Sequence, residues 1–114
     1  MPYDNSVLSL NPDGKTLLNT ETALRANNFE VLSVSSPIEA RFELEMGRCG
    51  VFLTSYITPS VIYEDLAKFF RRSCPGGLVV FLSKPTGAEV PDADIIFSEQ
   101  DEPHLIVERI RSNR

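Results

Sequence analysis

Short apolar runs alternate with amphipathic segments along the whole chain. The runs are rich in Val, Leu, Ile and Phe and are bounded by Gly, Pro, Asn or Ser, which is typical of strands buried on both faces of a parallel sheet. Between the runs, apolar residues recur every three or four positions, as they do in helices that cover a sheet. The pattern predicts strands at residues 7–10, 30–34, 51–54, 78–82 and 93–97. It predicts helices at residues 15–27, 36–46 and 60–72, and one more helix after Asp101.

This alternation of strands and helices predicts the architecture. Strands joined through helices form parallel sheets with right-handed crossovers, so we expect an α/β three-layer sandwich of the flavodoxin-like class. The expected sheet has five strands in the order 2-1-3-4-5, and the alternating pattern at residues 30–34 is typical of an edge strand. A chain of 114 residues is long enough for one core, so we expect a single domain over residues 1–114 with its core at about 6–111.

The helix at residues 36–46 has a regular apolar pattern. Ser36 is a typical N-cap and is followed by a proline, which suits the first helical turn, while Gly47 is placed to end the helix. Ile38, Phe42 and Met46 recur every four residues. We expect these three side chains to form the buried stripe of the helix.

The apolar run at residues 50–59 is the one around which the other elements are arranged. It begins at Gly50, ends as a strand at Ser55, and reaches Pro59 four positions later. In open α/β sheets, ligands and reacting groups bind at the carboxyl ends of the strands, where the strand order reverses. We therefore expect any site to form around Ser55, together with Asn11 after the first strand and Ser83 after the fourth.

Charge and segment composition restrict the partners. The net charge of −5 disfavours nucleic acid and anionic membrane surfaces, because both would repel the chain. No apolar run approaches the roughly 20 residues that span a bilayer. Residues 1–6 have no basic segment that leads into an apolar one, which is not the pattern of a secretory signal, so we expect a cytoplasmic protein.

The two cysteines, Cys49 and Cys74, each come just before an apolar run. If those runs are neighbouring strands, both thiols lie at the same edge of the sheet, and whether they approach each other stays open. Two thiols and the distant His104 cannot complete a tetrahedral zinc site, so we expect no metal there. In a reducing cytosol we expect two free thiols.

The layout resembles the receiver domain of bacterial response regulators, the CheY-like domain, over nearly the whole chain. In that family, the aspartate that accepts the phosphoryl group ends strand three, and a proline lies four positions further on. Here Ser55 takes the position of the acceptor, and Pro59 lies four positions beyond it.

The other functional positions of the family also fall on identifiable residues. The acidic pair that holds Mg²⁺ after strand one falls at Asn11 and Pro12, with Asp13 one place too late. The hydroxyl residue that ends strand four is matched by Ser83, and the lysine that follows strand five is replaced by Glu99.

A second alignment would match residues 83–85, Ser-Lys-Pro, to the lysine–proline motif that follows strand five in the family. That alignment leaves no strand four, and it leaves the run at residues 93–97 without a partner strand. We therefore reject it.

These departures imply a degenerate pseudo-receiver. Phosphoryl transfer to an aspartate needs a carboxylate nucleophile, a divalent cation, and a cation that takes over the leaving charge. The corresponding positions of this chain offer none of the three. We expect no phosphorylation of the family type, no bound Mg²⁺ or phosphate, no cofactor and no enzymatic activity.

Two functions are consistent with this interpretation. The first is a phosphorylation-independent protein–protein interaction module that binds a protein partner or a second copy of itself. The alternative is a small-ligand-binding domain whose pocket is formed by Asn11, Ser55 and Ser83 at the carboxyl ends of the strands. A separate hypothesis for this edge is an ion pair between Lys84 and Glu99, which would replace the family's contact to the phosphoacceptor.

The connection between strands four and five is short. Nine residues separate Ser83 from Ala93, where the family fits a loop, a helix and another loop, so we expect its fourth helix to be missing or collapsed. Loss of that helix would expose apolar groups of the two strands, and exposed apolar surface is a natural place for a partner. The residues expected to form this interaction surface are Val80, Leu82, Ile95 and Phe97.

Overall fold

The computed structural model describes residues 5–83, 92–98, 101–102 and 104–113, apart from the side chain of Thr16. Its strands form one parallel sheet in the order β2-β1-β3-β4-β5. The strands are β1 (Ser6–Leu10), β2 (Glu30–Val34), β3 (Val51–Ser55), β4 (Leu78–Ser83) and β5 (Ile95–Ser98). The described helices are α1 (Gly14–Ala26), α2 (Pro37–Glu45), α3 (Ser60–Ser73) and α4 (His104–Ser112). The predicted flavodoxin-like fold and strand order are confirmed.

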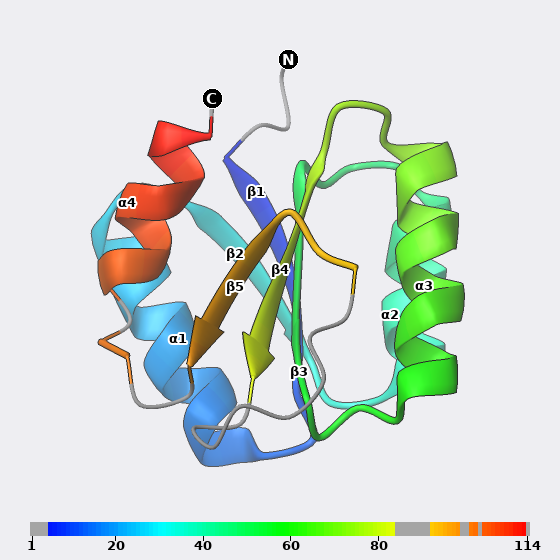
Figure 1. Cartoon of the computed structure of the whole chain (residues 1–114), viewed down its shortest axis with the longest axis horizontal. Helices are drawn as coiled ribbons and strands as arrows, with labels where there is room; N and C mark the ends of the chain where they lie inside the picture. The colour runs from blue at the N-terminus through cyan, green and yellow to red at the C-terminus, as the bar shows by residue number, and fades with distance from the viewer. Residues whose placement is uncertain (1–4, 84–91, 99–100, 103, 114) are drawn as a thin grey trace.

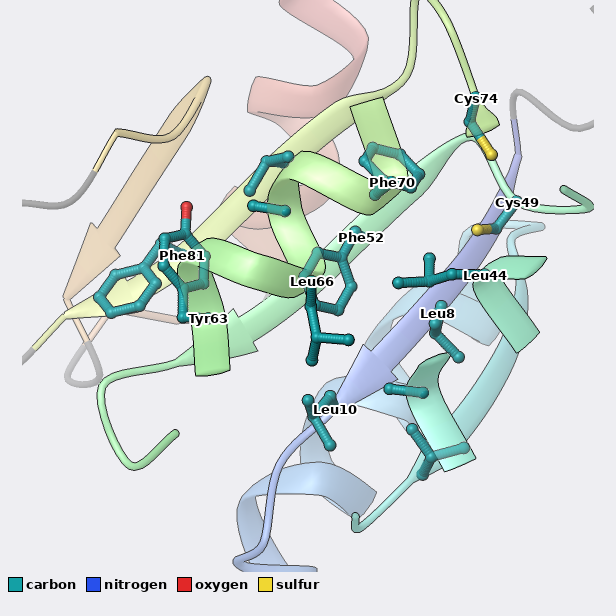
Figure 2. Close-up of a cluster of buried hydrophobic side chains, with 14 residues drawn as sticks. Leu8, Leu10, Leu44, Cys49, Phe52, Tyr63, Leu66, Phe70, Cys74 and Phe81 are labelled. Atoms are coloured by element: carbon teal, nitrogen blue, oxygen red, sulfur yellow. The ribbon is translucent and has the colours of Figure 1, made fainter. Parts of the chain in front are cut away.

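The sheet is covered on both faces, with α1 and α4 on one side and α2 and α3 on the other (Figure 1). The core therefore has two halves. One half lies under α2 and α3, where Phe52 and Phe70 are in ring contact with centroids 5.9 Å apart (Figure 2). The other half lies under α1 and α4. No helix in the described ranges is long and apolar enough to cross a membrane.

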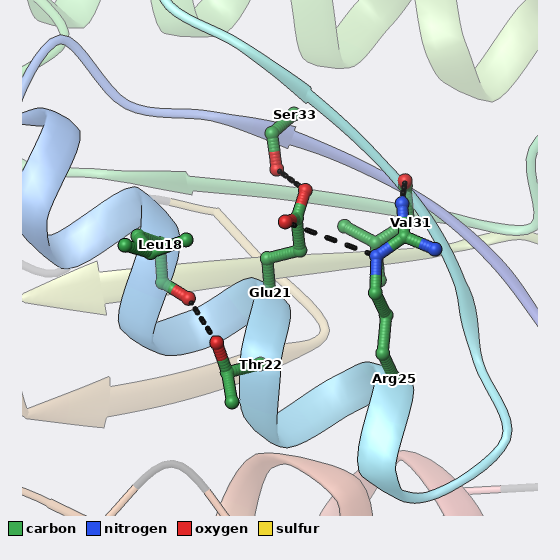
Figure 3. A network of polar contacts seen from close by, with 6 residues as sticks. All are labelled: Leu18, Glu21, Thr22, Arg25, Val31 and Ser33. Carbon is green, nitrogen blue, oxygen red and sulfur yellow. Dashed lines mark hydrogen bonds and ion pairs between the residues drawn. The ribbon is translucent and has the colours of Figure 1, made fainter.

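The edge strand β2 is held to α1 by a polar network (Figure 3). The Ser33 hydroxyl donates to a Glu21 carboxylate oxygen (2.8 Å), and Arg25 donates to the Val31 carbonyl (2.6 Å). The Arg25 and Glu21 head groups lie 3.8 Å apart. These contacts explain how a polar residue, Ser33, is accommodated on the face of β2 that α1 covers.

The fifth strand begins later than the sequence pattern predicts. The N–H of Asp94 donates to the Val79 carbonyl (2.9 Å), and the Asp94 carboxylate accepts from the Val79 N–H (2.8 Å). The Asp94 side chain thus accepts from the Val79 N–H, which would otherwise donate to a backbone carbonyl of the neighbouring strand. Strand β5 accordingly runs over Ile95–Ser98 instead of residues 93–97.

The predicted buried stripe of α2 is wrong. Ile38, Phe42 and Met46 are 83%, 61% and 48% exposed, and the buried residues of the helix are Ala40 and Leu44. Both sets have a four-residue spacing, so the periodicity does not select between them. The small Ala40 lets the helix backbone approach the sheet closely, and Leu44 then fills the space beside it. The larger side chains consequently face away.

The predicted interaction surface on β4 and β5 is also wrong. Val80, Leu82, Ile95 and Phe97 are all buried, because their side chains point to the face that α4 covers. Side chains alternate between the two faces of a strand, so the opposite face of these strands carries Phe81 and Ile96 instead. Phe81 packs edge-on against Tyr63, with ring centroids 5.0 Å apart. The helix expected to be missing or collapsed falls on residues 84–92, of which 84–91 lie outside the described residues.

Candidate functional site

The carboxyl ends of β1, β3 and β4 meet at one edge of the sheet, where the strand order reverses between β1 and β3. The register aligns Ser9 with Leu53, which places Asn11 and Ser55 two residues further along neighbouring strands. Ser55 is aligned with Leu82, the residue before Ser83. The structure therefore brings Asn11, Ser55 and Ser83 to the same edge, as the sequence predicted.

Asn11 is buried and shapes the loop between β1 and α1. Its N–H donates to the Val34 carbonyl (3.1 Å), which extends the ladder between β1 and β2. Its side-chain oxygen accepts from the Asp13 N–H (2.9 Å), which forms an Asx-type turn.

Asp13 is the N-cap of α1, and its carboxylate accepts from the Lys15 N–H (3.2 Å). Pro12, between Asn11 and Asp13, is exposed and carries no side-chain polar group. The amide of Asn11 and the carboxylate of Asp13 thus both serve the local backbone.

Ser55 is 2% exposed and ends β3. Its hydroxyl oxygen accepts a long hydrogen bond from the Ile57 N–H (3.4 Å), and its carbonyl accepts from the Thr58 N–H (3.0 Å). Next to it, the buried hydroxyls of Thr54 and Thr58 lie 3.0 Å apart. Ser55 therefore lies in a buried, hydroxyl-rich turn that leads into α3.

Thr58 is the residue of this turn that the sequence interpretation missed as part of the site. Its hydroxyl is buried against that of Thr54 because the chain folds back directly after β3. The available signal was the spacing, since a turn at a strand end brings residues three or four apart into contact. A hydroxyl four residues after Thr54 and next to Pro59 fits that geometry.

Ser83 ends β4 and uses its hydroxyl between strands. The hydroxyl donates to the Phe97 carbonyl on β5 (2.9 Å). Lys84 and Glu99, the residues of the predicted ion pair, lie outside the described residues. The predicted replacement of the family's lysine by Glu99 therefore lies outside them as well. The described part of the site consequently offers neutral oxygens from Asn11, Ser55 and Ser83.

The polar groups at this edge are satisfied. Over the described residues, every buried side-chain nitrogen and oxygen has a hydrogen-bond partner. No group of three or more His, Cys, Asp or Glu side chains in that part of the chain is placed to hold a metal ion. A small ligand at this edge would therefore have to displace existing hydrogen bonds.

Two cavities lie away from this edge. One, of about 330 Å³, is lined by Tyr63, Glu64, Ala67, Lys68, Arg71 and Asp92. In its wall the Tyr63 hydroxyl donates to the Asp92 carbonyl (2.8 Å), and burial raises the pKa of Tyr63 to about 12. The other cavity, of about 260 Å³, lies between β2 and α2 and includes Leu32, Glu43 and Arg48 in its lining. Neither of these two cavities contains Asn11, Ser55 or Ser83, so the predicted small-ligand pocket gains no support from them.

Cys49 and Cys74 precede β3 and β4 at the opposite edge of the sheet (Figure 2). Both are buried free thiols. Burial, followed by the charge of Cys74 and a hydrogen bond to it, raises the pKa of Cys49 to about 12. The two thiols therefore do approach each other, and Cys49 is held in its protonated form.

This shift predicts a loss of stability at alkaline pH. In the unfolded chain Cys49 ionises near pH 9.0, whereas in the folded protein it keeps its proton to about pH 12, so rising pH favours the unfolded chain. We expect the free energy of unfolding to fall by on the order of 1 kcal/mol between pH 8 and 10 through this group, because the unfolded chain loses the Cys49 proton in this range and the folded protein keeps it. Urea unfolding under reductant at several pH values measures the effect. Cys49→Ala should flatten the slope, and equal slopes in both proteins would contradict the assignment.

No protein-family model and no curated protein sequence matches the chain. Solved structures do match it. A response regulator receiver protein from Sinorhizobium medicae WSM419 is 22% identical, with a TM-score of 0.77 over 94% of this chain and 91% of that one. A CheY-like receiver domain protein from Methanospirillum hungatei JF-1 is 17% identical, with a TM-score of 0.80 over 95% and 91% of the two chains. The chain has the receiver-domain fold.

A third similar structure supports the same conclusion. The chemotaxis response regulator CheY4 of Vibrio cholerae is 15% identical, with a TM-score of 0.80 over 94% of this chain and 96% of that one. At such identities the likeness to receiver domains establishes the fold. The chemistry at the edge around Ser55 has to be inferred from the side chains of this chain.

Proposed function

We propose that this chain is a phosphorylation-independent protein–protein interaction module, a pseudo-receiver that keeps the receiver fold without its phosphoryl-transfer chemistry. The observation that carries the proposal is Ser55. A 2% exposed alcohol, with a backbone N–H as a hydrogen-bond partner, ends the strand at which the family has its acceptor aspartate.

The neighbouring groups support this proposal. Mg²⁺ prefers several hard oxygen ligands that include carboxylates, and it keeps part of its water shell. At the positions of the family's acidic pair, Asn11 already accepts from a backbone N–H and Pro12 has no polar side-chain atom. The nearest acid in sequence, Asp13, caps α1. A phosphoryl group would thus meet no carboxylate-held metal at this edge.

The sequence after β5 adds a charge argument. An anion at position 99, where the family has a lysine, would repel a phosphoryl group by roughly 4 kcal/mol per unit charge at about 4 Å and an effective dielectric of about 20. We therefore propose that the chain binds neither Mg²⁺ nor phosphate at this edge. The proposal also includes a protein partner or a second copy as the ligand, no enzymatic activity, and a cytoplasmic location.

Beryllofluoride tests the proposal because it mimics a phosphoryl group on an aspartate. We expect that beryllofluoride with Mg²⁺ leaves the amide NMR signals of Asn11, Ser55 and Ser83 unshifted. A receiver domain with an intact acceptor aspartate, treated in parallel, should shift and so controls for the reagent. Saturable shifts centred on Ser55 in this chain would overturn the proposal.

A further inference from the structure

An apolar surface is exposed on α2 and the adjacent edge strand. We define the α2 surface as Ile38 and Phe42 on the helix, Met46 at its C-cap, and Leu32 on β2, which is 46% exposed. Ile38, Phe42 and Met46 are spaced by four, so they lie along one side of α2. Figure 1 shows α2 on the outer side of the sheet, next to α3.

The fold does not need this surface for its own packing. Helix α2 is fixed to the sheet through Ala40 and Leu44, which are fully buried. Side chains as large as Ile38 and Phe42 are therefore free to contact another molecule. Contiguous exposed apolar side chains bordered by polar ones are typical of an interaction site.

A groove adjoins Leu32, the member of the α2 surface that lies on β2. The cavity of about 260 Å³ between β2 and α2 is lined in part by Leu32, Leu8, Glu43 and Cys49. Glu43 contributes to its wall from α2, whereas Ile38, Phe42 and Met46 do not line it. An apolar side chain of a partner could enter this groove while its neighbours cover the rest of the α2 surface, as in complexes in which a helix binds a groove.

The charges around the α2 surface are mainly negative. Glu39 and Glu45 are exposed on α2, Glu43 is half-buried at the groove, and Glu30 lines the same groove from β2. One nearby cation, Arg41, is already paired with Asp65 on α3 (3.1 Å).

Three cations lie near the α2 surface, on α2, on α3 and in the groove. Arg41 also stacks on the ring of Phe69, with 4.7 Å between the guanidinium carbon and the ring centroid. Arg72 on α3 lies over the same ring, with 5.8 Å from its guanidinium carbon to the ring centroid, and Arg48 lines the groove. Together with Asp65, the four glutamates still outnumber these three arginines. The border of the surface is thus complementary to a positively charged partner.

We propose that the α2 surface binds a basic amphipathic helix of a partner protein, whose apolar residues recur at three- and four-residue spacing and are flanked by Lys or Arg. The inference rests on the proposed function and names the partner's chemistry. A second copy fits less well, because a twofold contact between two α2 surfaces would bring the glutamates of both copies into one interface. An anionic membrane would be repelled by the same carboxylates.

Synthetic peptides test the charge and the location together. The probe is a helical peptide of Leu and Lys only, with Leu at amphipathic spacing, titrated into isotope-labelled protein. A peptide with Glu in place of every Lys is the matched control. We expect the Leu–Lys peptide to shift the amide signals of Leu32 and of residues 38–46, and the Leu–Glu peptide to leave them in place.

Substitutions then locate the contact. We expect Phe42→Asp to weaken binding of the Leu–Lys peptide by about tenfold or more, as the loss of a central aromatic contact does. Leu18→Asp is the matched control, because Leu18 is 60% exposed on α1, on the other face of the sheet. It should bind like the parent chain. Ile38→Asp is a second variant in case Phe42→Asp does not fold.

Three outcomes would overturn this inference: equal binding of both peptides, shifts centred elsewhere, or a dimer of the parent chain in light scattering that Phe42→Asp abolishes. The last would identify a second copy as the occupant. None of them involves the Ser55 signals that report on beryllofluoride, so failure of this inference is distinguishable from failure of the proposed function.

Discussion

Leu44→Ala is expected to lower the free energy of unfolding by about 2–5 kcal/mol, the range for leucine truncation in a core. Leu44 is fully buried and packs in the cluster between the sheet and α2, together with Leu8, Leu10 and Phe52 (Figure 2). Truncation removes its apolar contacts and leaves a cavity that the sheet cannot close, because the strands are fixed by their ladders.

Phe42→Ala is the matched control for this prediction, since it truncates a larger apolar side chain two positions away in the same helix. Phe42 is 61% exposed, so its loss should change the free energy of unfolding by less than about 0.5 kcal/mol. Urea unfolding of both variants and the parent chain gives the comparison. The reverse order, with Phe42→Ala the more costly, would mean that α2 packs with its other side toward the sheet.

Gly77→Ala is expected to cost about 1–3 kcal/mol, the range for overpacking a core. A Cβ at position 77 would lie 2.5 Å from Cζ and 3.0 Å from Cε2 of Phe70, and 3.1 Å from the Cys74 carbonyl oxygen. The ring of Phe70 cannot move away freely, because it is fully buried and packs against Phe52. The added methyl must therefore displace the ring or the backbone.

Gly14→Ala controls for the general effect of replacing a glycine. No atom lies within 4 Å of a Cβ built at position 14, so this variant should be neutral or slightly stabilising. A double variant, Gly77→Ala with Phe70→Leu, tests the cause. If the clash with the ring is responsible, the two effects will be less than additive. A fully additive result would assign the cost of Gly77→Ala to the backbone.

The strands and their order could be predicted from the sequence because their signal is local. A strand buried on both faces needs apolar residues at successive positions, and Val51–Ser55 and Leu78–Ser83 show such runs between turn residues. The connections through helices then restrict the sheet to few topologies. The start of β5 was the exception, since the pairing of Asp94 with Val79 depends on a side chain that reaches back to the backbone.

The sequence predicted the strand order better than it predicted which side of each helix or strand faces the core. Periodicity identifies a stripe, but α2 contains two stripes of equal spacing, and the small Ala40 decided between them. On β4 and β5, alternation divides the residues correctly into two sets, yet only the position of α4 shows that Val80, Leu82, Ile95 and Phe97 are covered. Both errors concern contacts between elements, which no local pattern encodes.

The residues of the candidate site could be predicted from the sequence, but their hydrogen bonds could not. Its members Asn11, Ser55 and Ser83 could be predicted because the ends of parallel strands meet at one edge. Their hydrogen bonds could not, because they depend on loop geometry: Asn11 turns onto Asp13, and Ser83 reaches the Phe97 carbonyl. The buried contact between Thr54 and Thr58 has the same origin.

The position of α4 in the chain has a consequence for synthesis. Its residues Ile106, Val107 and Ile110 cover the β5 end of the sheet, and Arg109 stacks on the Phe97 ring with 5.0 Å from its guanidinium carbon to the ring centroid. Because α4 follows β5, all five strands leave the ribosome before this cover does. During that interval the side chains of Val80, Leu82, Ile95 and Phe97 lack the cover that α4 gives them, so the nascent sheet exposes apolar surface to solvent.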